Sequence, residues 1–211
     1  DPMDMAAAYG VDPLRYFLMR EVSFGQDGSY SHEAIVTRCN AELANSFGNL
    51  AQRVLSMIFK NLGGEISIVE QNADDRELLG IVRKACAEEL PQAFEELSFS
   101  IGIDAWMKAV FACNQYVDTQ APWTLRKTDP ERMKAVLMTL FAAVRDLAIA
   151  IQPVVPGSAA RLLDQIGVEA RDFEALADTG WFDRLVASGF RIAQPIGVFP
   201  RLELGEEAAD A

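Results

Sequence analysis

The apolar and polar residues between Ser31 and Leu62 recur with the period of one long α-helix. Placed at about 100° per residue, the apolar side chains share a broad face and polar side chains form a narrow stripe opposite it. Ser31 is a candidate N-cap, and Gly63-Gly64 offers the left-handed conformation that ends a helix. We expect one helix of about 32 residues, close to 48 Å long at 1.5 Å per residue. The polar stripe contains Arg38, Glu42, Asn45, Asn49, Gln52, Arg53, Ser56 and Lys60.

The centre of this helix contains residues that form helices poorly. They are Asn40, Asn45, Gly48 and Asn49. Glycine costs about 1 kcal/mol relative to alanine inside a helix, and asparagine somewhat less. Two interpretations are open: a solvated stripe with a tolerated glycine, or a helix that keeps these residues for a site.

Residues 1–30 predict a short lead-in of mixed structure. A first helix begins at Asp1-Pro2 and ends at Gly10, and Asp12-Pro13 gives a cap and a first-turn proline for a second helix over 14–22. A loop with two glycines follows, and then the brief extended pair Ser29-Tyr30.

The chain after the long helix predicts a bundle of further helices. Proline is tolerated with a kink inside a well-patterned helix, and Asp-Pro pairs open helices. The expected elements are a partly extended connector over 65–72, a helix over 76–97 kinked at Pro91, a helix over 100–119 ending in Gln120-Ala121-Pro122-Trp123, a helix over 131–151 opened by Asp129-Pro130, a helix over 157–166, and an irregular segment from Gly167. The predicted fold class is an all-α helical bundle over residues 31–205 with the small mixed lead-in over 1–30 and a frayed tail over 206–211.

The composition indicates in which cellular compartment this bundle is found and whether its cysteines bind metal. Half of the 211 residues are hydrophobic, but charges interrupt the apolar runs too often for a membrane span, and the N-terminus lacks the pattern of a signal peptide. We expect a cytoplasmic chain without a membrane partner, and the start at Asp1 indicates a piece of a longer protein. Cys39, Cys86 and Cys113 are widely spaced, and His32 is the single histidine, so we expect buried free thiols and no structural zinc.

The net charge of −12 argues against broad binding to nucleic-acid phosphates. Local recognition of a few exposed bases remains compatible with this charge, because stacking and hydrogen bonds then discriminate.

No arrangement of residues typical of catalysis is present. His32 lies at a helix start, directly after the N-cap candidate Ser31, and we expect it to be an exposed first-turn residue and not a general base. Gly25-Gln26-Asp27-Gly28 lacks the glycines and the Lys-Ser/Thr pair of a phosphate-binding loop. The segment alone is therefore expected to be non-catalytic and to hold no cofactor.

Three residues are candidates for binding. Asn49 and Arg53 are four residues apart, hence neighbours on one helix face, and together they offer donors and an acceptor to base edges. Trp123 follows Pro122 at the end of a helix, where an indole serves either as a stacking platform for a base or as a core anchor. The sequence leaves both roles open.

Several stretches resemble the methionyl-tRNA synthetases. Residues 15–21 and 24–28 resemble the segment after the KMSKS loop of that family, and the closing residues 199–203 resemble its C-terminal return. The stretches that resemble its anticodon-binding helices are RCNAELAN (38–45), GNLAQR (48–53) and QAPW (120–123). The likeness spans nearly the whole chain in order, although residues 71–100 and 157–195 contribute little.

This resemblance implies a C-terminal piece of a class I ligase that attaches methionine to tRNA with ATP. The HIGH and KMSKS motifs and the zinc-bearing insertion of that family lie in a catalytic domain that would precede Asp1. Residues 1–30 then correspond to a stem-contact region, and Asn49, Arg53 and Trp123 to residues that contact the CAU anticodon. The implied partners are methionine-accepting tRNA and the upstream catalytic domain, and the implied state is a monomer.

Two alternatives remain. One is the anticodon-binding domain of a related class I synthetase (isoleucyl, leucyl, valyl or cysteinyl). The other is a protein-interaction bundle without an RNA role, which the net charge of −12 supports.

Overall fold

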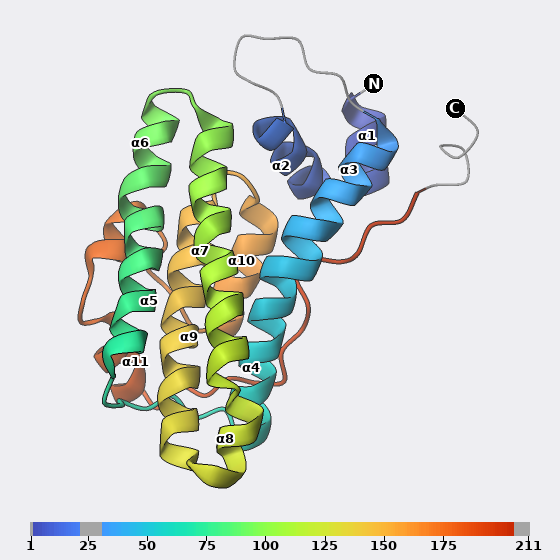
Figure 1. Cartoon of the computed structure of the whole chain (residues 1–211). Helices are drawn as coiled ribbons and strands as arrows, with labels where there is room; N and C mark the ends of the chain where they lie inside the picture. Colours follow the sequence, from blue (N-terminus) through green and yellow to red (C-terminus); the bar gives the residue numbers. More distant parts are fainter. Residues whose placement is uncertain (1, 22–30, 205–211) are drawn as a thin grey trace.

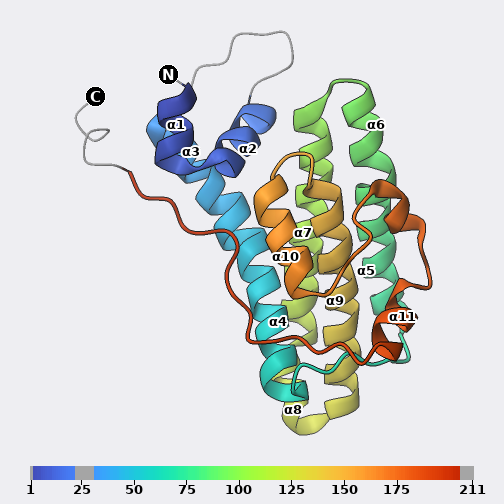
Figure 2. The same ribbon diagram turned by 180° about the vertical axis from the view of Figure 1, so that it is seen from behind.

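A computed structural model describes residues 2–21 and 31–204 of the chain (Figures 1 and 2). Within these ranges the fold is helical, and extended pairing is limited to one isolated antiparallel bridge between Glu65 and Arg191. The prediction of an all-α bundle is confirmed. The predicted loop at 23–28, the extended pair Ser29-Tyr30 and the tail over 206–211 lie outside the described residues.

The bundle is built around α9 (Pro130–Ile151), whose residues from Met133 onward are almost all buried. A helix that is apolar on every side must be covered on every side. Its start is as predicted, with the Asp129 side chain accepting a hydrogen bond from the Arg132 backbone N–H at 3.0 Å. The helices that surround it are α4 (Asn49–Leu62), α5 (Ala73–Lys84), α7 (Phe99–Gln120), α8 (Pro122–Thr128) and α10 (Pro156–Gln165).

The predicted long helix extends over the expected residues, but its middle is not α-helical. It consists of α3 (His32–Cys39), the π-helical segment η1 (Asn40–Gly48) and α4. The Ser31 hydroxyl accepts from the Ala34 N–H at 3.0 Å, and Gly63 ends the helix with φ 61°. Both predicted ends are therefore confirmed.

The π-helical segment changes which side chains face solvent. Glu42 was expected in the solvated stripe, yet it is buried and accepts hydrogen bonds from Tyr16 at 2.6 Å and Arg38 at 3.0 Å. Burial, followed by the Glu42 charge, raises the pKa of Tyr16 well above its usual value. The expectation was wrong because a π turn, with its i→i+5 bonds, holds more residues than an α turn and rotates later positions.

Two of the poor helix formers, Asn40 and Gly48, contact the C-terminal strap, which we define as residues 191–204. The Asn40 side chain donates to the Leu202 carbonyl at 2.9 Å and accepts from the Leu202 N–H at 2.7 Å. A Cβ on Gly48 would lie 3.2 Å from the Cβ of Phe199 and 2.9 Å from the Leu43 carbonyl oxygen. Asn45 and Asn49 remain exposed, as a solvated stripe requires. Asn40 and Gly48 instead contact the strap, a packing role that neither interpretation anticipated.

The strap follows α11 (Trp181–Ala187) and runs across the bundle towards the end where α1 and α3 lie (Figure 2). Gln165 of α10 holds it by donating to the Ile196 carbonyl at 2.9 Å and accepting from the Ile196 N–H at 2.7 Å. Arg161 donates to the Val198 carbonyl at 3.2 Å.

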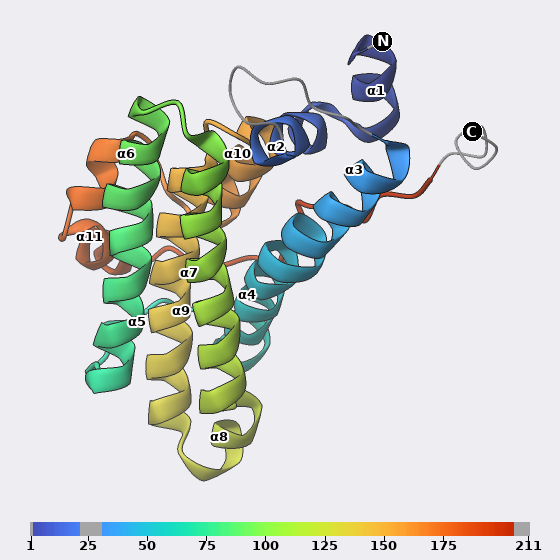
Figure 3. The ribbon, with the colours of Figure 1, turned by 45° about the horizontal axis from the view of Figure 1, so that its top comes forward.

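The lead-in contains α1 (Pro2–Tyr9) and α2 (Val11–Glu21), which lie at the opposite end of the bundle from α8 (Figures 1 and 3). The first helix ends at Gly10 as predicted. The second begins before Asp12, so the predicted cap is wrong. The Asp12 carboxylate instead accepts from the Gly157 and Ser158 N–H groups, at 3.2 and 2.5 Å, and caps α10.

Three further expectations are modified. Pro91 lies within α6 (Leu90–Glu95) and follows the π-helical turn η2 (Ala85–Glu89), which continues the path of α5. Pro122 opens α8 where a non-helical corner was expected. The segment after Gly167 contains η3 (Phe173–Ala177) and α11, which its weak periodicity did not reveal.

All three cysteines are buried free thiols, as predicted. Burial, with a smaller contribution from Glu42, raises the pKa of Cys39 to about 12, and burial raises that of Cys113 to about 12. No cluster of three potential metal ligands occurs in the described part of the chain. Among the helices of residues 2–21 and 31–204, none has the length and apolar character to cross a membrane.

A buried carboxylate joins three helices at the α8 end. Asp75, in the first turn of α5, is fully buried and accepts from Arg132 at 2.6 and 2.8 Å and from the Tyr116 hydroxyl. It also completes a capping box with Asn72. Burial alone would raise the pKa of Asp75, but the hydrogen bonds from Arg132, Tyr116 and Asn72 outweigh it and lower the pKa below its usual value.

This lowered pKa predicts an acid-sensitive contribution to stability. The contribution is present above the unfolded pKa, about 3.9, and is lost as the pH falls through the lower folded pKa. Denaturant unfolding between pH 7 and pH 2.5 should show the stability gap between the wild type and Asp75→Asn narrowing below about pH 4. A gap that stays constant over this range would contradict the prediction.

The contact at Gly48 predicts opposite effects of two Gly→Ala substitutions. Gly48→Ala gains helix propensity but collides with Leu43 and Phe199, so we expect a net loss of about 1 kcal/mol. Gly80→Ala is the matched control, because nothing lies within 4 Å of an added Cβ there, and it should gain up to about 1 kcal/mol. Urea unfolding of both variants measures the two signs.

Candidate nucleic-acid interface

Asn49 and Arg53 lie one turn apart on the same face of α4. Asn49 is exposed and Arg53 is partly exposed. Both follow the π-helical segment and lie in regular α-helix, so their spacing of four residues places them on the same face. The structure brings them together as the sequence predicted.

The Arg53 guanidinium is shared between two neighbours. Its Nη1 donates to Asp118 of α7 at 3.1 Å, and its Cζ lies 6.0 Å from the centroid of the Trp123 ring. The side chain of Asp118 is 65% exposed, and an ion pair this open contributes at most about 1 kcal/mol. An incoming hydrogen-bond acceptor can therefore replace the carboxylate without a large cost.

Trp123 is the second residue of α8. Ala121 separates α7 from α8 in a left-handed conformation (φ 45°), and Pro122 is buried as the first residue of the new helix. The indole of Trp123 is 47% exposed. Pro122 is thus the anchor of this corner, and the exposure of Trp123 favours the platform over the core anchor.

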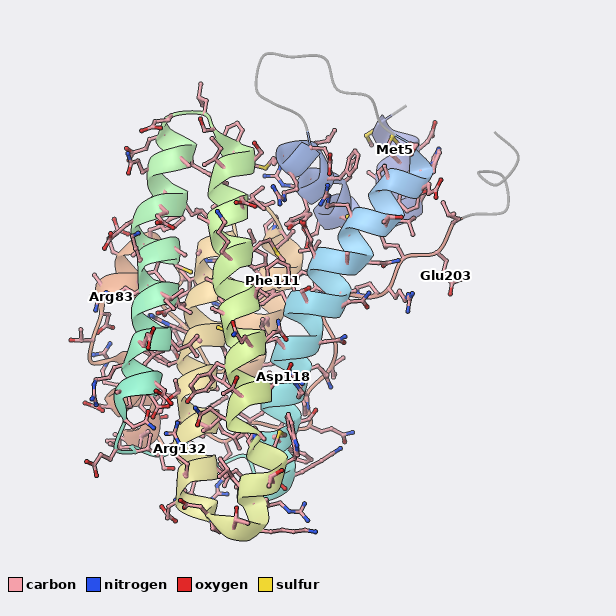
Figure 4. All side chains as sticks on the ribbon, viewed as in Figure 1. Met5, Arg83, Phe111, Asp118, Arg132 and Glu203 are labelled. Carbon is pink, nitrogen blue, oxygen red and sulfur yellow. The ribbon has the colours of Figure 1, made fainter. Side chains whose placement is uncertain are left out.

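Phe111 is a large exposed side chain on the same side of α7 as Asp118. It is 54% exposed. Figure 4 shows both residues projecting from α7 beside the continuous helical rod, which we define as α3, η1 and α4. In the sequence, Phe111 lies among the apolar positions of this helix, next to Val110. The polar residues one turn away on either side, Lys108 and Gln115, are the signal that could have identified it as exposed.

Basic side chains gather near Trp123 despite the acidic chain. Arg126 and Lys127 lie three and four residues after it on α8, hence on its face, and Lys60 lies on the face of Arg53. Arg126 also donates to Asn61 at 3.3 Å, which ties α8 to α4. The result is a local positive region around an exposed aromatic ring.

His32 is not the exposed residue that the sequence predicted. It is half-buried, its Nδ1 shares a hydrogen bond with the Tyr9 hydroxyl at 2.6 Å, and the two rings lie 5.6 Å apart. It lies on α3, far along the rod from α8 (Figure 1).

Two family models match the chain. Residues 1–55 match the model described as "tRNA synthetases class I (M)", and residues 72–209 match the "Anticodon binding domain of methionyl tRNA ligase". The chain belongs to the methionyl-tRNA ligase family. This match favours methionyl-tRNA ligase over the related synthetases and over an unrelated interaction bundle, and it identifies residues 72–209 with the anticodon-binding domain of that family.

Relatives in this family agree along almost the whole chain. The methionine–tRNA ligase of Mesorhizobium japonicum is 44% identical over 203 residues, which cover 95% of this chain and 39% of the relative. That of Brucella suis is 43% identical over 207 residues, with 98% of this chain and 40% of the relative covered. The chain thus spans about two fifths of the length of the curated relatives it matches.

Solved methionyl-tRNA synthetases share the fold. The free form of the Mycobacterium tuberculosis enzyme superposes with a TM-score of 0.86 at 40% identity, covering 97% of this chain and 41% of that one. The same enzyme in complex with methionyl-adenylate gives a TM-score of 0.84.

The exposure of Trp123 predicts the quenching of tryptophan fluorescence. Trp106 is fully buried and Trp181 is partly covered by Arg145, so Trp123 should account for most iodide-accessible emission. Trp123→Phe should therefore remove most of the quenching that iodide produces in the wild type. Equal quenching in the two proteins would show that the indole is covered.

Proposed function

We propose that this chain reads the CAU anticodon of methionine-accepting tRNA through Asn49, Arg53 and Trp123. The observation that carries the proposal is the exposed indole of Trp123 beside the Arg53 guanidinium, on a chain that belongs to the methionyl-tRNA ligase family.

Trp123 would supply the stacking. Every base has a π-face, and stacking on an exposed aromatic ring contributes about 1–3 kcal/mol per base. The Trp123 ring is accessible to an unstacked anticodon base because it projects from the short helix α8 at one end of the bundle.

Asn49 and Arg53 would read the edges of the stacked bases. The amide offers a donor and an acceptor, and the guanidinium offers paired donors to carbonyl or ring-nitrogen acceptors. The base would compete with Asp118 for Arg53, which the exposure of that ion pair permits. Hydrogen bonds to base edges, rather than charge, would then set the preference for CAU.

The local basic side chains would add only a few phosphate contacts. Lys60, Arg126 and Lys127 flank the ring, whereas the chain as a whole carries a charge of −12. Single-stranded RNA binding weakens with salt in proportion to the phosphates neutralised, with a log–log slope of about −0.7 for each. We expect a shallow salt dependence and a strong dependence on base identity.

The chemistry of the ligase would lie outside this chain. We propose that methionine activation with ATP takes place in a catalytic domain that precedes residue 1 in the full-length protein, and that residues 1–30 form the stem-contact region between the two. The rod α3–η1–α4 supports this arrangement, because it connects the lead-in directly to the α8 end (Figure 3).

The test is a titration with an anticodon stem-loop carrying CAU and with a second one changed at a single base. The wild type should prefer CAU, and Trp123→Ala should weaken CAU binding by about 1–3 kcal/mol without changing the helical melting transition. Arg53→Lys should reduce the preference for CAU, because an ammonium cannot offer paired donors.

Phe173→Ala is the matched control for the loss of an exposed aromatic ring. Phe173 is 38% exposed on η3, away from α8, and its loss should leave RNA binding unchanged. Equal binding of both stem-loops would count against the site, and indifference to both would favour a protein-interaction bundle.

A further inference from the structure

Trp123 sits on a helix that is too short to hold its own position. The helix α8 has seven residues, and isolated helices of this length are unstable in water. The position of α8 depends on its neighbours: Pro122 is buried at its start, and Arg126 donates to Asn61 of α4. Because Trp123 is 47% exposed, its orientation depends also on how the two helices that flank α8 are held.

The two helices that flank α8 are joined to each other by a side-chain hydrogen bond. Gln120 is the last residue of α7, three residues before Trp123, and Arg132 lies in the first turn of α9. The Nη2 of Arg132 donates to Oε1 of Gln120 at 2.8 Å. This bond spans the base of the α7–α8–α9 corner from which Trp123 projects.

Arg132 is itself fixed by a buried carboxylate. Its guanidinium makes paired hydrogen bonds to Asp75, and Asp75 is fully buried, so the donor that reaches Gln120 has a defined direction. The amide nitrogen of Gln120 donates in turn to Asp74 at 3.1 Å. Gln120 is thus held from both sides by charged groups of α5 and α9.

We propose that Gln120, held by Arg132 and Asp75, is a positioning residue that fixes Trp123 for stacking on an anticodon base. This inference rests on the proposed function of Trp123. Gln120 does not act on the base itself. It limits the motion of the connection between α7, α8 and α9, so that a larger fraction of molecules holds the Trp123 indole in the orientation that binds a base.

The expected effect follows from population arithmetic. If only a fraction of molecules holds Trp123 in the competent orientation, the apparent dissociation constant rises by the inverse of that fraction. Loosening the corner should therefore weaken binding of the CAU stem-loop about 3- to 10-fold, less than removal of the indole.

The experiment uses Gln120→Leu, which removes the acceptor while keeping a side chain of similar length. Gln92→Leu is the matched control, because Gln92 is an exposed glutamine of α6 that bonds only locally, to Glu96 at 3.1 Å. Gln120→Glu retains the acceptor for Arg132 but replaces the donor to Asp74 with a second carboxylate, so it should restore part of the binding. Thermal melting of each variant shows whether the bundle is intact.

A spectroscopic readout separates positioning from general stability. The chain has three tryptophans, so labelling with 5-fluorotryptophan gives three ¹⁹F resonances, and Trp123→Phe assigns one of them. In Gln120→Leu we expect the Trp123 resonance to shift or broaden, while those of Trp106 and Trp181 stay in place. Gln92→Leu should leave all three unchanged.

The outcomes distinguish this inference from the proposed function. A wild-type chain that does not prefer the CAU stem-loop overturns the proposed function, and this inference with it. If the wild type prefers CAU and Trp123→Ala loses binding, but Gln120→Leu binds as tightly as wild type or leaves the Trp123 resonance unchanged, only the inference falls. Weaker binding together with an altered Trp123 resonance in Gln120→Leu, partly restored in Gln120→Glu, supports it.

Discussion

The burial of α9 on every side is the constraint on which the rest of the fold depends. A helix without a polar face is stable only where other helices exclude water from it completely. This requirement brings α4 and α5 together with α7, α8 and α10, which lie next to α9 in the sequence. The Trp106 indole N–H is one polar group that this packing buries, and it donates to the Leu147 carbonyl at 3.0 Å. The position of α8 follows from this constraint, because it links α7 to α9 directly.

The candidate interface lies where this core ends. Helices α4 and α7 use their apolar faces against α9, which leaves Asn49, Arg53 and Asp118 on the outside. The corner at Pro122 turns the chain so that the buried proline anchors it and the following indole faces water. A closely packed interior with low compressibility thereby presents a small set of exposed groups in fixed relative positions.

The sequence predicts what local patterns determine. The spacing of Asn49 and Arg53 places them together because both lie in regular α-helix, and Ser31 and Gly63 end their helix by local chemistry. The same reasoning failed for Glu42, since the periodicity assumed an α-helix through the π-helical segment.

Long-range contacts could not be read from the sequence. Asp75 and Arg132 are 57 residues apart, and Asp12 caps a helix 145 residues later, so no local pattern signals either contact. The exposure of Trp123 was equally undetermined, because it depends on whether Pro122 or the indole fills the corner. The exposed Phe111 lies in a helix whose other apolar residues are mostly core.

The path of the C-terminal strap has a practical consequence. The strap carries the chain back along the bundle, so that its end and the helix α1 both lie on the side of α3, and α8 lies at the other end (Figures 1 and 2). Anything attached through either terminus, such as an immobilising tag, a fluorescent label or a fused domain, therefore leaves the α8 end open to solution. Attachment chemistry for surface-based binding measurements can use both termini interchangeably, without masking the ring of Trp123.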